Sequence, residues 1–248
     1  MKAIILAGGY AKRLGSLAEN LAKPLLPLGG RRIIDYIIDK VEELPNIDET
    51  IIFTNEKFRQ QFEEWLRKRK SPKKIRVVAE PSSHEEEKLG AIKALAWLFS
   101  TYESIRDDCL ILAGDNLFTS SLKPFIDYYY EKKSSPIVAV YSLDKPELVK
   151  YFSAVRLDSN GLIVDFREKP KEALSTLVGT GIYLLPKETL NLLEDYLAED
   201  SNYDSPGHFI SWLCKRMKVY GYRLEGYWID VGTPEAYQEA MKNEKAKF

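Results

Sequence analysis

Four charged side chains stand close to the ends of short apolar runs in this sequence. Arg13 follows "AIILAGG", Lys23 opens "KPLLPLGG", Asp115 ends "CLILAGD" and Asp230 ends "YWID". Permanent cations stabilise the charge that builds on polyphosphate oxygens, and one or two carboxylates commonly hold Mg²⁺ together with substrate phosphate. Either aspartate alone is more simply a turn or helix cap. Taken together with the cations, the pair predicts phosphate chemistry with Mg²⁺ bound by Asp115 and Asp230.

The first apolar run leads directly into Gly8 and Gly9. Glycines after a strand let the backbone approach a ligand, and amides exposed there can bind phosphate. The segment "GGYAKRLG" matches neither G-x-x-x-x-G-K-[ST] nor G-x-G-x-x-G, which disfavours P-loop hydrolysis and hydride transfer. A Gly-Gly pair alone usually marks a tight turn, so the nearby cations carry the argument for a ligand.

Other reactive residues give weaker signals. His84 and His208 are too few and too far apart in the sequence for a metal triad or a nucleophile-base pair. Cys109 and Cys214 lack metal-ligand spacing and are interpreted as core thiols in a reducing compartment.

Composition narrows the class of protein. The 248 residues include 36 Lys and Arg against 37 Asp and Glu, which excludes the broad positive charge expected of a protein that binds nucleic acid or an anionic membrane. A signal peptide and an apolar run of membrane-spanning length are both missing from the sequence. A soluble cytoplasmic protein is expected.

The elements that position these residues follow from periodicity. Short runs rich in Ile, Val and Leu predict buried strands at 2–7, 50–55, 74–80, 109–115 and 136–143. Apolar residues spaced by three and four predict helices at 31–44, 55–70, 88–99 and 121–133. This alternation predicts an α/β fold with a mostly parallel sheet and ligands at the carboxyl ends of its strands.

The pattern changes after Tyr151. Residues 152–170 alternate around Asn160-Gly161, which predicts a hairpin because both residues tolerate positive φ. Neither a repeat nor a Pro/Gly-rich linker interrupts the chain, so residues 1–248 are expected to form one domain.

Six motifs, in order along nearly the whole chain, resemble those of one enzyme family. They are "LAGGYAKRL" at 6–14, "KPLLPL" at 23–28, "GDN" at 114–116, "EKP" at 168–170, "GTGIY" at 179–183 and "WIDVGTPE" at 228–235. The chain resembles sugar-1-phosphate nucleotidylyltransferases of the glucose-1-phosphate thymidylyltransferase type, the pyrophosphorylases that make NDP-sugars. The resemblance implies a Rossmann-like nucleotide-diphospho-sugar transferase fold, with a mixed, mostly parallel central sheet flanked by helices.

The resemblance also implies a reaction and a role for each residue. A sugar 1-phosphate oxygen attacks the α-phosphate of an NTP, and pyrophosphate leaves. Residues 1–150 would form the nucleotide-binding half and residues 151–248 the sugar-phosphate-binding half. The catalytic residues would be Arg13, Lys23, Asp115, Lys169 and Asp230. The nucleotide would be bound by Leu6, Ala7, Gly8, Gly9, Glu80, Leu89 and Gly90. The sugar phosphate would be bound by Ser153, Glu168, Lys169 and Gly181.

Two departures from the family pattern leave the substrates open. Glu80 stands where a base-reading Gln is common, and a carboxylate only accepts hydrogen bonds, which suits the two donors of guanine. Ser153 stands where Gly is expected. Glucose 1-phosphate with dTTP or UTP is favoured. The alternatives are a mannose-1-phosphate guanylyltransferase, a cytidylyltransferase of another phosphorylated small molecule and, less favoured, a non-catalytic regulatory subunit. Assembly into a homo-oligomer is left open.

Overall fold

The computed structural model describes residues 1–10, 12–17, 19–172, 175–200, 202–243 and 248. The chain divides into two compact units, each made from several segments. Unit 1 comprises residues 1–88, 112–122 and 226–248, and unit 2 comprises residues 89–111 and 123–225. None of the described helices is long and apolar enough to cross a membrane.

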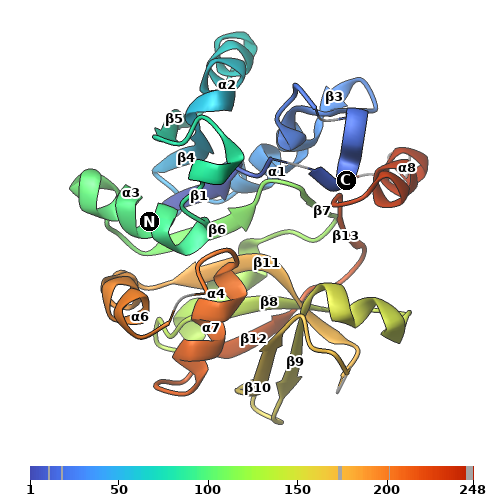
Figure 1. Cartoon of the computed structure of the whole chain (residues 1–248). Coiled ribbons are helices and arrows are strands. Elements are labelled where there is room, and N and C mark those ends of the chain that lie inside the picture. Colours follow the sequence, from blue (N-terminus) through green and yellow to red (C-terminus); the bar gives the residue numbers. More distant parts are fainter. Residues whose placement is uncertain (11, 18, 173–174, 201, 244–247) are drawn as a thin grey trace. The chain divides into compact units, whose positions relative to one another are not determined.

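Three parallel strands form the centre of unit 1 (Figure 1). β4 (Glu49–Asn55) lies between β1 (Lys2–Leu6) and β5 (Lys74–Glu80), and Ile4 pairs with Ile51 in register. Every residue of β4 is buried, as expected of a strand covered on both faces. The carboxyl ends of β1, β4 and β5 therefore lie at one edge, where the sequence predicts a ligand.

Helices follow the strands of unit 1. α1 (Ile33–Glu42) begins with Asp35 accepting a hydrogen bond from the Arg32 backbone, and α2 (Glu56–Lys68) is capped by Asn55, whose side chain accepts from the Phe58 amide. The amphipathic α2 packs against β4 and β5 through the buried Phe58 and Phe62.

Shorter elements complete unit 1. β7 (Asn116–Phe118) pairs with β13 (Trp228–Asp230) in antiparallel register, and α8 (Pro234–Asn243) follows β13. β2 (Pro27–Leu28) pairs with β3 (Arg31–Arg32). Three 3₁₀ segments are η1 (Lys12–Leu17), η2 (Lys23–Leu25) and η3 (Glu85–Glu87). β6 (Cys109–Ala113) contains residues of both units.

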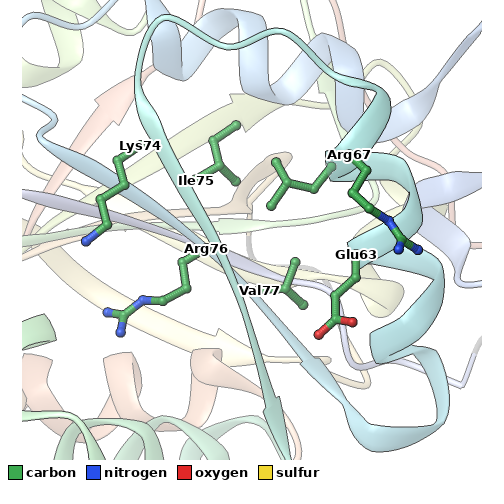
Figure 2. Close-up of a pocket in the computed structure, with 7 residues that line it drawn as sticks. Glu63, Arg67, Lys74, Ile75, Arg76 and Val77 are labelled. Atoms are coloured by element: carbon green, nitrogen blue, oxygen red, sulfur yellow. The ribbon is translucent and has the colours of Figure 1, made fainter.

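A groove of about 510 Å³ runs beside β5 and α2 in unit 1. Lys74 and Arg76 point to one side of β5, whereas Ile75 and Val77 point to the other (Figure 2). Among the described strands, β5 pairs only with β4. Charged side chains on such an edge strand discourage pairing with strands of other molecules.

Unit 2 has its own, mixed set of strands. β11 (Leu177–Leu185) pairs in antiparallel fashion with β8 (Ile137–Ser142) and β9 (Ser153–Leu157), β9 pairs with β10 (Ile163–Glu168), and β12 (Tyr220–Arg223) lies parallel to β8. The 3₁₀ segments of this unit are η4 (Glu103–Ile105) and η5 (Pro146–Tyr151).

The helices of unit 2 are α3 (Ala91–Thr101), α4 (Lys123–Glu131), α5 (Lys187–Asn191), α6 (Leu193–Glu199) and α7 (Pro206–Cys214). Two of them, α6 and α7, share a buried aromatic cluster. Tyr196 of α6 contacts Phe209 and Trp212 of α7, with ring centroids 5.5 and 5.8 Å away. This cluster fixes α7 against α6, and α7 also contacts β10.

Strands and helices lie where periodicity predicts them, and the hairpin of residues 152–170 is present as β9 and β10. Its turn differs in detail. Of the two turn residues, only Gly161 has a positive φ, of 80°. The Asp158 side chain accepts from the Asn160 and Leu162 amides, which closes a longer turn over residues 158–162. The prediction that the chain forms one domain stays a prediction.

Candidate active site

A partly buried ion pair joins two of the predicted residues in unit 1. The Lys23 ammonium lies 2.6 Å from Asp115 Oδ2, and the Lys23 side chain is 11% exposed. Lys23 is the first residue of η2, and Asp115 lies two residues after the end of β6. The chain between β6 and Asp115 lies close to β1, because the Gly114 amide donates to the Leu6 carbonyl at 2.9 Å. A Cβ at Gly114 would lie only 2.8 Å from that carbonyl oxygen. Glycine is therefore required for this approach.

Asp230 is the last residue of β13, the strand that pairs with β7 just after Asp115. It pairs with Asn116 in the β13–β7 register, and the Val231 amide donates to the Asp115 carbonyl at 2.9 Å. Burial lowers the pKa of Lys23, but the charges of Asp115 and Asp230 outweigh burial and raise the pKa above its ordinary value. The Lys23 ammonium therefore remains charged, paired with Asp115 and stabilised by the charge of Asp230.

Arg13 and Asp230 both approach Gly232. A Cβ at Gly232 would be 3.0 Å from Asp230 Oδ1 and 3.4 Å from Arg13 Nη2. Arg13 is exposed, and its positive charge lowers the pKa of Lys23 slightly against the effect of the carboxylates. Unit 1 thus brings Arg13, Lys23 and the two aspartates together, with one cation partly buried and one open to solvent.

The glycines after β1 are not required by the local fold. Neither Gly8 nor Gly9 has a positive φ, and a Cβ at Gly9 would meet no described atom within 4 Å. The preceding backbone is held from β4: Thr54 Oγ1 donates to the Ala7 carbonyl at 3.2 Å, and Asn55 Nδ2 donates to the Gly8 carbonyl at 2.8 Å. Glycine here leaves the backbone uncovered, which favours close approach of a ligand.

Glu80 ends β5 and is 5% exposed. Its Oε1 atom accepts a hydrogen bond from Ser82 Oγ at 2.7 Å, and Ser82 Oγ lies 3.4 Å from the Tyr10 hydroxyl. A chain of polar contacts therefore runs from the loop after β1 to Glu80.

The carboxylates suit a magnesium ion. Mg²⁺ is usually bound through one or two carboxylates, with water and substrate phosphates filling the remaining positions. Asp115 and Asp230 supply that number, and among the described residues there is no cluster of three or more potential metal ligands. Asn116 follows Asp115 in the chain and pairs with Asp230 in the strand register. Its buried Oδ1 has no hydrogen-bond partner among the described residues. These oxygens match the donors that Mg²⁺ prefers.

A second group of predicted residues lies in unit 2, around Glu168. This side chain is 7% exposed, and Glu168 pairs with Ser153 in the β10–β9 register. Ser153 Oγ donates to Glu168 Oε2, and Ser205 Oγ donates to Glu168 Oε1 at 2.8 Å. Burial, followed by the Glu168 charge, raises the pKa of Tyr183, so that hydroxyl stays neutral.

Lys169 and Gly181 have unusual backbone conformations. Lys169 has φ of 43°, which is uncommon for a residue with a side chain, and its 61% exposed ammonium lies 3.8 Å from Glu168 Oε1. Gly181 has φ of 75° and lies on β11 where its register with β8 shifts. A positive φ is strained at Lys169, and strain of this kind is concentrated at functional sites, whereas glycine adopts it freely at position 181.

Leu89 and Gly90 also belong to unit 2, at the start of α3. Gly90 has φ of 78°, and a Cβ there would lie 2.8 Å from the Tyr203 carbonyl. Packing alone therefore explains this glycine. The predicted site residues form two groups, one in each unit.

Three residues that take part in these groups are missing from the predictions. Asn55, Gly232 and Ser205 act through contacts with distant parts of the chain. Only Gly232 had a usable signal, because it belongs to the motif "WIDVGTPE". Asn55 and Ser205 carry no signal beyond that of ordinary helix caps.

The fold and the charged groups near its strand ends are those expected of a nucleotidyltransferase. A comparison of the sequence with family models gives the same class. The chain belongs to the nucleotidyl transferase family, which matches residues 2–247. This confirms, at the level of the nucleotidyl transferase family, the resemblance carried by the six motifs.

Two groups of curated relatives match almost the whole chain. The bifunctional protein GlmU of Methanocaldococcus jannaschii is 33% identical over 98% of this chain, and the glucose-1-phosphate adenylyltransferase of Thermomicrobium roseum is 30% identical over 96%. These matches cover 54% and 58% of the relatives, so the chain spans little more than half of their length. The family prediction is confirmed, but these relatives do not single out the thymidylyltransferase type.

Solved structures confirm the fold class. A protein from Bacillus anthracis assigned as a glucose-1-phosphate thymidylyltransferase, in complex with sucrose, has a TM-score of 0.79 at 24% identity, covering 99% of this chain and 95% of that one. A UDP-glucose pyrophosphorylase complexed with UDP-glucose has a TM-score of 0.82 at 20% identity, covering 99% and 98%. The central, mostly parallel sheet flanked by helices is thus the nucleotide-diphospho-sugar transferase fold.

Proposed function

We propose that this protein transfers a nucleotidyl group from an NTP to a sugar 1-phosphate and releases pyrophosphate. A phosphate oxygen of the sugar 1-phosphate forms a bond to the α-phosphorus of the NTP. The bond from that phosphorus to the oxygen bridging the α- and β-phosphates breaks, and the electron pair leaves with pyrophosphate. This displacement needs no covalent enzyme intermediate.

The observation that carries the proposal is the charged group in unit 1. Lys23 is paired with Asp115 and feels the charge of Asp230, and both Arg13 and Asp230 approach Gly232. A triphosphate needs cations at both its reacting and its leaving groups, and this group supplies two. A structural ion pair would not need the additional exposed Arg13.

Each charged residue then has a role. Arg13 binds the β- and γ-phosphates and stabilises charge on the departing pyrophosphate, while Lys23 binds the phosphates at the reacting centre. Asp115 and Asp230 would hold Mg²⁺, which supplies electrostatic stabilisation of phosphate oxygens. The backbone of Leu6, Ala7, Gly8 and Gly9 receives the nucleotide, with open space for its approach at Gly9.

We assign the sugar phosphate to the Glu168 group of unit 2. Glu168 accepts hydrogen bonds from sugar hydroxyls and the exposed Lys169 ammonium binds the phosphate, with Ser153 and Gly181 beside the sugar. Glucose 1-phosphate is the favoured acceptor, because glucose occurs in the names of an adenylyltransferase relative and of both structural neighbours.

The nucleobase is the least constrained part of the substrate. We favour dTTP or UTP, in line with the two structural neighbours. The buried carboxylate of Glu80 supports GTP as the alternative, because its remaining acceptor capacity suits the N1–H and N2–H donors of guanine. Leu89 and Gly90 are assigned to the same nucleotide by resemblance alone.

Pyrophosphate release should be measured for five NTPs, each with a panel of sugar 1-phosphates and related phosphorylated compounds. We expect one NTP and one acceptor to give turnover that depends on added Mg²⁺. If every combination is silent while NTP still binds, the protein is a regulatory subunit and the proposed activity is wrong. The cytoplasmic location and any homo-oligomer remain predictions, which fractionation and sedimentation would test.

A further inference from the structure

Both carboxylate oxygens of Glu168 are engaged by serine hydroxyls. Ser153 lies directly opposite Glu168 on β9, whereas Ser205 comes from the segment before α7. Ser205 Oγ also accepts a hydrogen bond from the Gly207 amide at 3.4 Å. Because this acceptor position is in use, the single hydroxyl proton of Ser205 points to Glu168.

Gly207 leaves the space that the carboxylate occupies. A Cβ at this position would lie 2.0 Å from Glu168 Oε2 and 2.8 Å from Ser153 Oγ. Gly207 is buried in the first turn of α7, and α7 is held against α6 by the contacts of Tyr196 with Phe209 and Trp212. The start of α7 therefore determines where the Glu168 carboxylate lies.

We propose that Ser205 is a positioning residue that, with Ser153, holds Glu168 in a single orientation for accepting sugar hydroxyls. The identity of the ligand as a sugar phosphate rests on the proposed function, whereas the positioning of Glu168 by Ser205 does not depend on it. A carboxylate oxygen can accept two hydrogen bonds, so one serine on each oxygen leaves acceptor capacity for a ligand. A side chain locked by its neighbours binds without losing rotamer freedom.

The test compares Ser205→Ala, Ser205→Gly and Ser205→Thr. We expect Ser205→Ala and Ser205→Gly to raise the KM for the sugar phosphate about tenfold, the size of losing one hydrogen bond to a charged group, with kcat and the KM for NTP within about twofold. Ser205→Thr keeps the hydroxyl and should restore the KM. A purely capping role predicts instead that glycine, which caps almost as well as serine, behaves like the wild type.

Ser211→Ala is the matched control, because Ser211 lies on the same helix and donates to the Phe166 carbonyl instead. Crystal structures of the wild type, Ser205→Ala and Ser211→Ala test the positioning without turnover, and only Ser205→Ala should displace the Glu168 carboxylate. An unmoved carboxylate in Ser205→Ala, or an unchanged KM for the sugar phosphate, overturns the inference. A wild type that turns over no sugar phosphate contradicts the proposed function, while the crystal structures still decide the positioning.

Discussion

Arg13 is the exposed cation of the unit 1 group, and its removal should leave the fold intact. We expect Arg13→Ala to lower kcat by about two to three orders of magnitude, as for loss of one strong stabiliser of transition-state charge. Steady-state pyrophosphate release measures this effect, with circular dichroism as the check on folding. Arg59→Ala is the control, because Arg59 pairs with Glu56 and Glu63 on the surface of α2. Activity within a few-fold of the wild type would mean that Arg13 binds no phosphate.

The two aspartates should act as a unit. Asparagine keeps the shape of aspartate but loses the charge that holds a hard cation, so Asp115→Asn, Asp230→Asn and the double variant should be similarly inactive. Raised Mg²⁺ or Mn²⁺ should restore part of the activity of the single variants and least of the double. The measurement is turnover against metal concentration, with Asp165→Asn in unit 2 as the control.

A purely structural role for Asp230 makes the opposite prediction. The helix-cap role that the sequence allowed belongs to Thr233, whose Oγ1 accepts from the Ala236 amide at the start of α8. Asparagine keeps the shape of aspartate, so activity would survive if Asp230 bound no metal. Near-normal turnover of Asp230→Asn that EDTA still abolishes would leave Asp115 alone to hold the metal.

Glu80 bears on the nucleobase. If its carboxylate accepts from guanine, Glu80→Gln should weaken GTP use and improve UTP or dTTP use, because the amide replaces one acceptor by a donor. Ratios of kcat/KM for the NTPs measure the change. Glu63→Gln, on the exposed surface of α2, is the control. Unaltered preference in Glu80→Gln would show that this side chain does not read the base.

Sequence reasoning found the charged residues of the site but few of the groups that hold them. Lys23 and Asp115 stood out because Lys23 opens one apolar run and Asp115 ends another, and the structure places their charged groups 2.6 Å apart. Asn55 and Ser205 could not be found, because their importance lies in contacts with Gly8 and Glu168 that sequence spacing does not reveal.

At the scale of strands, Glu49 links all three parallel strands of unit 1. It pairs in register with Lys2 of β1 and Lys74 of β5, and its carboxylate lies within 4 Å of the charged groups of Lys2, Lys74 and Arg76. Burial raises the pKa of Glu49, but the hydrogen bond from Lys74 and the charges of Arg76 and Lys2 outweigh burial and lower the pKa overall.

This lowered pKa predicts a pH-dependent stability. The contribution of Glu49 is complete above its unfolded-state pKa and is lost as the pH falls through the lower folded-state pKa. Glu49→Gln should therefore reduce the free energy of unfolding by about 1–3 kcal/mol at neutral pH and by much less in acid. Urea denaturation of both proteins across this pH range tests the prediction, with Glu63→Gln as the control. A difference that is constant with pH would contradict it.

Periodicity was sufficient for the long elements and insufficient for the short ones. β4 and α2 have unambiguous apolar patterns, whereas β7 and β13 are three-residue strands whose pairing depends on a distant partner. The turn at Gly161 was found from its composition, but its length depends on the Asp158 side chain.

At the scale of the whole molecule, each unit is assembled from separate stretches of chain. Deleting residues 226–248 would remove β13 and the hydrogen bonds between Thr119 and Tyr227, which lie 108 residues apart. We expect the truncated chain to lose native packing in unit 1 while unit 2, which ends at Glu225, keeps dispersed amide signals in NMR spectra. Equal loss of signals in both units would contradict this expectation.

The pairing of β7 with β13 also sets an order of events during protein synthesis. β7 leaves the ribosome long before its partner, and Asp115 emerges long before Asp230. All of unit 2 has been translated by the time residue 226 is added. A nascent chain can therefore complete the Glu168 group before residue 226 is added, but it cannot bring the two aspartates together until residue 230 has been added.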